Sequence, residues 1–336
     1  MNPKLNKNKF NWQEAIARYA KSHMGRSLWQ LTSTLILYIV MWVIIVRSLA
    51  VSYWLALALS VIAAGLLVRI FIIFHDCTHG SFFKSMKLND IVGFWTGVLV
   101  FTPYEYWRHE HSVHHASAGD LDHRGVGDIW TMTVKEYQHS SRGRKLAYRL
   151  ARNPFILFFI APLFMFLIKQ RFSPPRVGPK ERVGIYRTNL AILVTALAVS
   201  HIIGWKALVV IQLPILFIAA GTGLWLFYVQ HQFEGAYWGR SEKWDYVTEA
   251  LKGSSFYRLP KILQWFTGSI GFHHIHHLSP KIPNYYLEKC HQAVVLFRQV
   301  KPITFTMSLK SLTFRLWDED HHVFVGFGYL KRLSPC

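Results

Sequence analysis

Three groups of closely spaced histidines are the chemically distinctive feature of this chain. They lie in the segments HDCTHG, WRHEHSVHH and GFHHIHH. If these segments are helical, residues four apart share a face, and positions i, i+3 and i+4 fall within an arc of about 100°. Each group can then turn two or three imidazoles toward one region, which is the geometry of a metal site. The histidines in phase are His75 and His79, then His111, His114 and His115, and finally His273, His276 and His277.

These eight imidazoles are too many for a single metal ion. One zinc ion is usually satisfied by four ligands, and imidazole suits iron as readily as zinc. A purely structural role for three such groups would require a separate hydrogen-bonding partner for each ring in apolar surroundings. A lone HxxxH pair, by contrast, occurs by chance on many helices. We therefore expect a site for two metal ions.

Several polar side chains lie next to these histidines in the sequence. A metal-bound imidazole usually donates its second N–H to a carboxylate or another acceptor, which fixes the orientation of the ring. We expect that role for Asp76, His109, Glu110, Asp120, Glu234 and His274. An ordinary exposed acid is an equal interpretation for each carboxylate, and Asp76 is the strongest candidate because it lies inside the first group. Trp107 and Arg108 either position the second group or cover the metals, and core packing and a membrane-surface contact are equal alternatives.

The elements that must position the histidines are predicted to be membrane helices. Hydrophobic residues make up 51% of the 336 residues and charged residues 17%, whereas soluble domains usually contain about 25% charged residues. This composition excludes a disordered chain and argues against an ordinary soluble enzyme. Uncharged apolar runs long enough to cross a bilayer cover residues 28–46, 48–68, 188–205 and 207–230. The expected fold is an all-α integral membrane protein in which four transmembrane helices form two hairpins.

Two further apolar runs, Ile91 to Phe101 and Phe155 to Ile168, are too short to cross a bilayer as helices, so we expect them to be re-entrant or interfacial. Cytoplasmic loops carry an excess of Lys and Arg. This rule places the histidine-bearing regions 69–187 and 231–336 on the cytoplasmic side, as a helical cap. Residues 1–27 are expected to lie on the same side as an interfacial segment on the bilayer surface. With no internal repeat, the whole chain is predicted to be a single domain.

The chain is strongly basic, with 38 Lys and Arg against 18 Asp and Glu and a net charge of +20 when histidine is neutral. In a soluble protein this balance would indicate nucleic acid. Here the membrane surface is the better partner, and we expect no nucleic acid. Three widely separated cysteines indicate neither a disulfide framework nor a thiolate metal site. The sequence carries no signature for nicotinamide, haem or an iron–sulfur cluster, so electrons must come from another protein.

With their flanking residues, the segments HDCTHG and PYEYWRHEHSVHHASAG resemble the acyl-lipid branch of the membrane fatty acid desaturase superfamily, from about Phe74 to His277. Members typically have Gly at the position of Thr78, a difference that we expect to alter only local packing. The resemblance implies an oxidoreductase whose non-haem diiron centre uses dioxygen and two electrons to desaturate a long fatty acyl chain. It implies iron ligation by the eight histidines above and by His231, which lies where the fourth span ends.

The resemblance also implies partners and a location. The electron donor would be a ferredoxin-like or cytochrome b5-like protein, and the substrate an acyl lipid of the membrane. The lack of a fused donor indicates a bacterial inner membrane enzyme whose active site faces the cytoplasm. Within the superfamily, a membrane hydroxylase or a carotenoid ketolase is an alternative. From other classes, a zinc-binding membrane protein and a metal-ion transporter stay open, although the apolar runs contain almost none of the mid-membrane ionisable residues that transport sites use.

Overall fold

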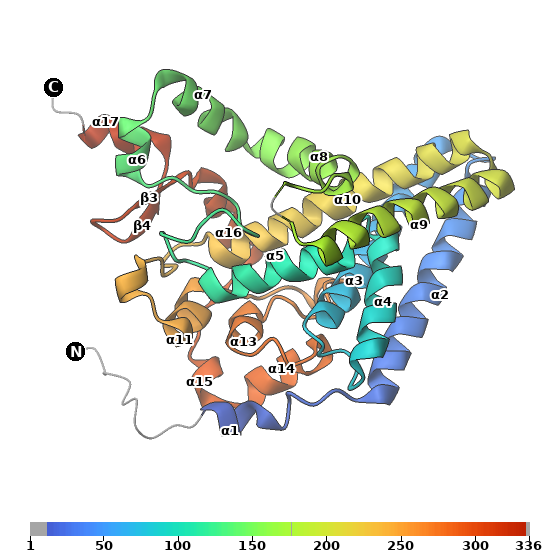
Figure 1. The fold of residues 1–336 in the computed structure, drawn as a ribbon, viewed down its shortest axis with the longest axis horizontal. Helices are drawn as coiled ribbons and strands as arrows, with labels where there is room; N and C mark the ends of the chain where they lie inside the picture. Colours follow the sequence, from blue (N-terminus) through green and yellow to red (C-terminus); the bar gives the residue numbers. More distant parts are fainter. Residues whose placement is uncertain (1–11, 176, 334–336) are drawn as a thin grey trace.

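The computed structural model describes residues 12–175 and 177–333, and it is mostly helical. Four helices of this described chain are long and apolar enough to cross a membrane. They are α2 (Met24–Ser48), α3 (Tyr53–Thr78), α9 (Pro179–Ile203) and α10 (Trp205–His231). Figure 1 shows that α9 and α10 lie side by side and reach the same end of the molecule as α2. The predicted number of long apolar helices is confirmed.

The helix bounds differ from those expected for two reasons. Polar residues cap the helices, and the helices continue through charged residues at which the apolar runs end. Residue 48 was expected to begin the second run, but α3 begins at Tyr53 because the side chain of Ser52 accepts a hydrogen bond from the Trp54 N–H at its start. This helix continues to Thr78, ten residues beyond the expected end, and so carries His75 within a regular helix. At the other turn, Gly204 alone separates α9 from α10, with a φ of 85°.

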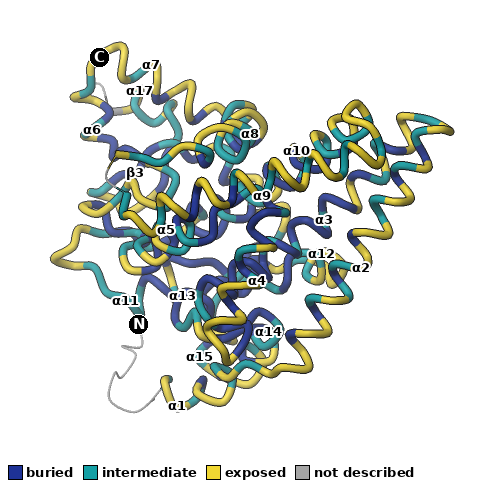
Figure 2. Tube along the Cα trace, turned by 45° about the vertical axis from the view of Figure 1, so that its right-hand side comes forward, coloured by how far each residue is buried: buried dark blue, intermediate teal, exposed yellow. Residues whose placement is uncertain are grey.

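The helix α3 is the central element of the four. It packs against α2 on one side and α10 on the other, and 56% of its most apolar stretch is buried, against 17% for α9. Figure 2 shows the contrast between the buried trace of α3 and the largely exposed trace of α2. Exposed apolar side chains such as Trp29 and Ile202 cover the outer helices, as expected of a surface that contacts lipid.

The two shorter apolar runs form broken or short helices. Residues 91–99 of the first run lie in α4 (Met86–Leu99), whose 14 residues span only about 21 Å. The second forms a π-helical turn, η1 (Ile156–Ile160), followed by α8 (Ala161–Leu167) and η2 (Lys169–Arg171). Together they bend by 61° from α7 (Arg142–Ala151), so α7 and this run form either a broken span or a re-entrant segment.

The first described helix packs against the rest of the protein. Residues 1–11 lie outside the described residues, and α1 (Trp12–Ala17) follows them. Its Ile16 is only 4% exposed and belongs to a core cluster with Ile72, Ile275 and Leu287. This apolar side chain is therefore buried against the protein, and the location of residues 1–27 at the bilayer surface stays a prediction.

Short elements complete the part that carries the histidines. The helices are α5 (Tyr104–Ser117), α6 (Val134–His139), α11 (Tyr246–Thr248), α12 (Lys261–Phe266), α13 (His273–Leu278), α14 (Asn284–Ala293), α15 (Val295–Arg298), α16 (Phe305–Ser308) and α17 (Leu330–Leu333), with a π-helical turn η4 (Glu249–Gly253) and 3-10 turns η3 (Ser241–Lys243), η5 (Leu309–Thr313) and η6 (Phe327–Tyr329). Most of these lie to one side of the four long helices in Figure 1.

Two small pairs of strands correct the expectation of an all-α fold. β1 (Phe256–Tyr257) pairs in parallel with β2 (Pro302–Ile303), and β3 (Leu316–Asp318) pairs antiparallel with β4 (Val323–Val325). The β3–β4 hairpin forms because Trp317 and Phe324 face each other across it and pack on Trp238 in a small apolar cluster. The fold is mostly helical, with strands confined to the region beyond α10.

Candidate metal centre

The structure brings the nine histidines predicted as ligands into two compact groups. The five-histidine group comprises His75, His79, His111, His115 and His276, and the four-histidine group comprises His114, His231, His273 and His277. Within each group, the nitrogen atoms on offer all lie within 4.8 Å of one another. The side chains come from the end of α3, from α5, from the last residue of α10 and from α13, four elements that meet at the centre of the molecule (Figure 1).

Each HxxHH segment divides its imidazoles between the two groups. On α5, His111 and His115 enter the five-histidine group, while His114 enters the other. On α13, His273 and His277 stay together and His276 crosses to the first group. The reason is helical geometry, because residues four apart differ by about 40° in direction, whereas positions i+3 and i+4 differ by about 100°. One helix thus serves two sites.

The spacing of the nitrogen atoms suits ligands of a common ion. The Nε2 atom of His115 lies 3.1 Å from that of His111 and 3.0 Å from that of His276. In the other group, the Nε2 atom of His231 lies 3.1 Å from that of His114 and 3.0 Å from that of His273. Two nitrogens bound at right angles to one ion at about 2.1 Å are about 3.0 Å apart. The residues present therefore fit one metal ion in each group.

Unpartnered nitrogen atoms support this fit. Among the described residues, the Nε2 atoms of His79 and His277 are buried and have no hydrogen-bond partner. A buried polar atom without a partner is costly, and a metal ion would satisfy both nitrogens. Neither group includes a carboxylate or a thiolate, so the donor set is entirely imidazole, which suits iron, zinc or copper better than magnesium or calcium.

The electrostatics keep the imidazoles in the form that binds metals. Burial, reinforced by neighbouring histidines, lowers the pKa of six of them well below 6.5, namely His79, His111, His114, His115, His273 and His276. An imidazole must be neutral to donate a nitrogen lone pair. These six imidazoles can thus bind cations near neutral pH without first losing a proton.

Asp76 lies against the five-histidine group. Its Oδ1 atom is 3.4 Å from Nδ1 of His75, and its Oδ2 atom accepts hydrogen bonds from the backbone N–H of Asn284 at 2.7 Å and from its side-chain amide at 2.8 Å. The carboxylate is 1% exposed. Asp76 therefore orients the His75 ring and also joins α3 to the first residue of α14.

Glu249 is a site residue that the sequence reasoning missed. It is completely buried, with carboxylate oxygens 3.3 Å from Nδ1 of His277 and 3.9 Å from Nδ1 of His231. Ser254 donates a hydrogen bond to it at 3.0 Å. A Cβ atom on Gly253 would lie 3.1 Å from Glu249 Cγ, so glycine there makes room for the acid. The sequence does hold a signal, because Glu249 is the one acidic residue between Asp245 and Glu288.

Trp107 covers the first group, one of the alternatives left open by the sequence. Its indole stacks on the ring of His111, with centroids 4.1 Å apart and planes 23° apart. It also contacts Phe71 and Phe74 of α3. Beside the four-histidine group, the ring centroid of Phe227 lies 5.0 Å from the ring centroid of His114. These aromatic rings limit the access of water to the imidazoles.

The other flanking residues do not lie against the predicted ligands. Glu234 is 67% exposed in its side chain and pairs with Lys310, and Glu110 accepts a hydrogen bond from Tyr106 at 2.7 Å. Asp120 is bonded to His123 and Ser241. No hydrogen bond in the described part of the chain joins any of these three carboxylates to one of the nine histidines. Their expected role is corrected because each has a nearer partner of its own.

His109 and His274 also face away from the two groups. His109 lies about 200° around the helix from His111 and is exposed at the edge of a cavity. His274 is buried, and its Nε2 atom lies 3.4 Å from Nδ1 of His291. Burial lowers the pKa of His274 to about 3. Both expectations are therefore corrected, since adjacency in sequence turns a helical side chain by about 100° away from its neighbour.

Known proteins similar to this chain share one description. A family model described as fatty acid desaturase matches residues 52–302. The chain is 53% identical over 318 residues to a fatty acid desaturase of Bacillus subtilis, covering 95% of this chain and 90% of that protein. It is 28% identical over 282 residues to an endoplasmic reticulum omega-3 fatty acid desaturase of Nicotiana tabacum, covering 76% and 70%. It is 28% identical over 240 residues to an sn-1 acyl-lipid omega-3 desaturase (ferredoxin) of Synechocystis sp., covering 67% and 63%.

Proposed function

Because the chain belongs to the membrane fatty acid desaturase superfamily, we propose that it inserts a double bond into a long fatty acyl chain of a membrane lipid, at two iron ions held by the nine histidines. The observation that carries the proposal is the division of these histidines into a five-histidine and a four-histidine group with converging nitrogen atoms. The overall reaction would take up dioxygen, two electrons and two protons, and it would release two water molecules for each pair of hydrogens removed.

The chemistry explains why the site is built from metal ligands and not from acids and bases. A saturated methylene has no polar group for an acid or base to act on. Two bound iron ions would supply the activation of dioxygen that removal of its hydrogens requires. The nine imidazoles would hold the ions, and Asp76 and Glu249 would hold His75, His231 and His277 in place. The Trp107 ring would exclude water.

For the membrane arrangement, we propose that α2 with α3 and α9 with α10 form two hairpins, with the histidine groups on the cytoplasmic side of a bacterial inner membrane. The basic residues of the segment from Lys169 to Arg187 support this orientation, and the run from Phe155 to Ile168 would be re-entrant. Cysteines introduced at Arg47 and Lys206 should react with an impermeant label from outside. Labelling of the Lys169 to Arg187 segment from outside would contradict the orientation.

Metal analysis tests the central proposal directly. Full-length protein purified without oxygen should contain about two iron ions per chain and little zinc. His79→Ala should lower the iron content because it opens the five-histidine group, whereas His109→Ala should retain it because His109 faces away. Zinc in place of iron, or full iron content in the His79 variant, would count against the assignment.

Product analysis tests the reaction. With a reduced ferredoxin or cytochrome b5 as electron donor, mass spectrometry should show an acyl product two hydrogens lighter than the substrate. A product heavier by one oxygen atom would instead identify a hydroxylase. Product analysis does not depend on the metal analysis, so a failure of the proposed reaction can be told apart from a failure of the proposed metal site.

A further inference from the structure

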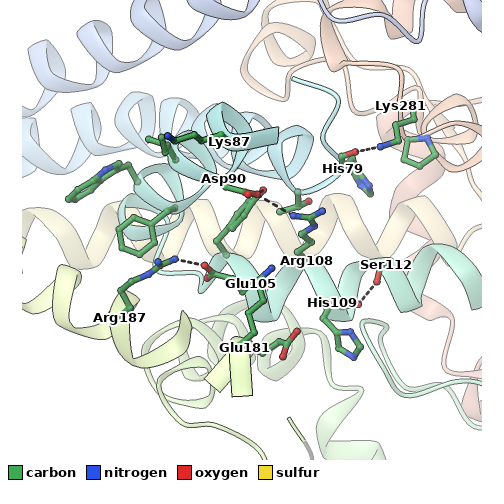
Figure 3. Close-up of a pocket in the computed structure, with 17 residues that line it drawn as sticks. His79, Lys87, Asp90, Glu105, Arg108, His109, Ser112, Glu181, Arg187 and Lys281 are labelled. Atoms are coloured by element: carbon green, nitrogen blue, oxygen red, sulfur yellow. Dashed lines mark hydrogen bonds and ion pairs between the residues drawn. The ribbon is translucent and has the colours of Figure 1, made fainter. Parts of the chain in front are cut away.

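A cavity of about 830 Å³ opens beside the five-histidine group, between α4, α5, the first turns of α9 and the loop after α13 (Figure 3). His79 lies in its wall. The cavity is rich in charge, with five cations and three carboxylates among its lining residues. These are Lys87, Arg108, Lys180, Arg187 and Lys281, with Asp90, Glu105 and Glu181.

The paired charges leave a basic excess in this cavity. Arg108 pairs with Asp90 at 3.2 Å, and Arg187 pairs with Glu105. The ammonium of Lys281 donates a hydrogen bond at 2.9 Å to the backbone carbonyl of His79, which fixes it at the edge of the metal centre. Figure 3 shows these three contacts across the cavity. Positive charge therefore remains to attract an anionic ligand.

Two lysines are available to bind such a ligand. Lys87 on α4 and Lys180 on α9 line the cavity from two different helices. Within residues 12–175 and 177–333, neither ammonium has a hydrogen bond or an ion pair. A lysine ammonium is a compact donor that binds phosphate oxygens well. The two side chains thus face the same space without a protein acceptor.

The wall next to Lys87 is apolar. Ile91, Phe94 and Trp95 on the same helix line the cavity, and Ile91 and Trp95 are 47% and 57% exposed. A space with a cationic side and an exposed apolar side suits an amphiphile with an anionic head. Its volume lies within the range of about 300–1,000 Å³ that is usual for sites of small ligands.

We propose that this cavity binds the phosphate headgroup of the lipid whose acyl chain is desaturated, with Lys87 and Lys180 as the phosphate partners. The inference rests on the proposed function, because it names the headgroup chemistry of that substrate. A phosphate held beside His79 places the attached acyl chain next to the five-histidine group. The same phosphate chemistry occurs in acyl-coenzyme A, and the test separates this source from the phospholipid.

The experiment measures binding to the full-length, iron-loaded protein in detergent by native mass spectrometry. The probes are dipalmitoyl phosphatidylglycerol, dipalmitoylglycerol, which lacks the phosphate, and palmitoyl-coenzyme A. The wild type should bind the phosphatidylglycerol at least about tenfold more tightly than dipalmitoylglycerol, since one lost charge-assisted hydrogen bond weakens binding by about that factor. K87Q/K180Q should lose this preference, and K87R/K180R should keep it and so show that the cavity still folds.

The control is K289Q/K301Q, which removes the same charge at two exposed positions outside the cavity and should bind like the wild type. Equal binding of dipalmitoylglycerol by the wild type, or an undiminished preference in K87Q/K180Q, would overturn the headgroup site. A lysine-dependent preference for palmitoyl-coenzyme A over the phospholipid would overturn the lipid as the source. The iron content and acyl product of the wild type test the proposed function separately.

Discussion

A single buried carboxylate links two histidines that come from different elements. Glu249 faces His277 of α13 and His231 at the end of α10, and it is shielded completely from solvent. An acceptor for the second N–H raises the basicity of a ligating imidazole and holds its tautomer. A lone carboxylate in this position would otherwise be an unpaired buried charge, which proteins rarely tolerate. Its position makes sense if the neighbouring imidazoles carry a cation.

We predict that Glu249→Gln weakens metal binding without preventing folding. The amide is isosteric and still accepts the hydrogen bond from Ser254, but it no longer balances a bound cation. Loss of such a partner typically costs about 10–100-fold in metal affinity. Iron remaining after dialysis against a graded series of chelator concentrations measures the effect. Glu234→Gln is the matched control, because its exposed carboxylate pairs with Lys310, and equal iron retention in the two variants would refute the role of Glu249.

Asp128 supplies a pH-dependent prediction away from the metal centre. Burial raises the pKa of this carboxyl from 3.8 to about 6 in the folded protein. The folded state therefore holds its proton more tightly than the unfolded state. The protonated Asp128 carboxyl contributes fully to the stability of the folded state below about pH 4. This contribution is lost as the pH rises through about 6, which lowers the free energy of unfolding by about 1–3 kcal/mol at neutral pH.

Asp128→Asn should therefore stabilise the protein more at pH 7.5 than at pH 5. Asparagine remains uncharged, and its side-chain oxygen can still accept the hydrogen bond from the Gly125 N–H. Melting temperatures of the variant and the wild type, measured in the same detergent at pH 5 and pH 7.5, report this difference in stability. Asp122→Asn should instead lower the melting temperature at pH 7.5, since a hydrogen bond from Arg240 lowers the pKa of Asp122. A gain for Asp128→Asn that does not change with pH would contradict the explanation.

At the scale of elements, the long helices and the histidine positions were accessible from sequence, and the partners of those histidines were not. Helical phase and apolar run length are local properties, so they predict four long helices and the convergence of each histidine segment. Glu249 reaches His231 and His277 only through tertiary packing. Asp120 and Glu234 likewise find Ser241 and Lys310 in space. Adjacency in sequence is thus a poor guide to which side chain supports a ligand.

The turn between α9 and α10 gives a prediction about an element boundary. Gly204 is the single residue between the two helices and adopts φ 85° and ψ 144°, a conformation that costs residues with a Cβ atom about 1–3 kcal/mol. A Cβ atom would meet nothing within 4 Å at this position, so backbone strain is the expected cost. Gly204→Ala should lower the melting temperature. Gly223→Ala, inside α10 with equally open space, should be neutral or stabilising, and similar losses in both variants would disprove the strain argument.

At the scale of the whole molecule, the net charge and the exposed apolar side chains bear on which partners the chain can meet. The chain carries a net charge of +20, and its long helices expose apolar side chains such as Trp29 and Ile202. The candidate metal centre lies in the region of short helices at the ends of these four elements. Besides these apolar helices, the cavity beside the candidate metal centre is lined by five cations and three carboxylates. The net positive charge of the chain favours anionic lipids and acidic proteins.

We predict that turnover depends on salt only when the electron donor is scarce. An acidic one-electron carrier is attracted by the net positive charge of the chain, and raising salt from about 0.05 to 0.5 M shortens the reach of this attraction. Oxygen consumption at limiting ferredoxin should therefore slow several-fold. At saturating ferredoxin the effect should largely disappear, because encounter no longer limits the rate. An equal loss of rate at both donor concentrations would indicate that salt acts on the enzyme itself, and desaturation with nicotinamide cofactor alone would show that no external protein donor is needed.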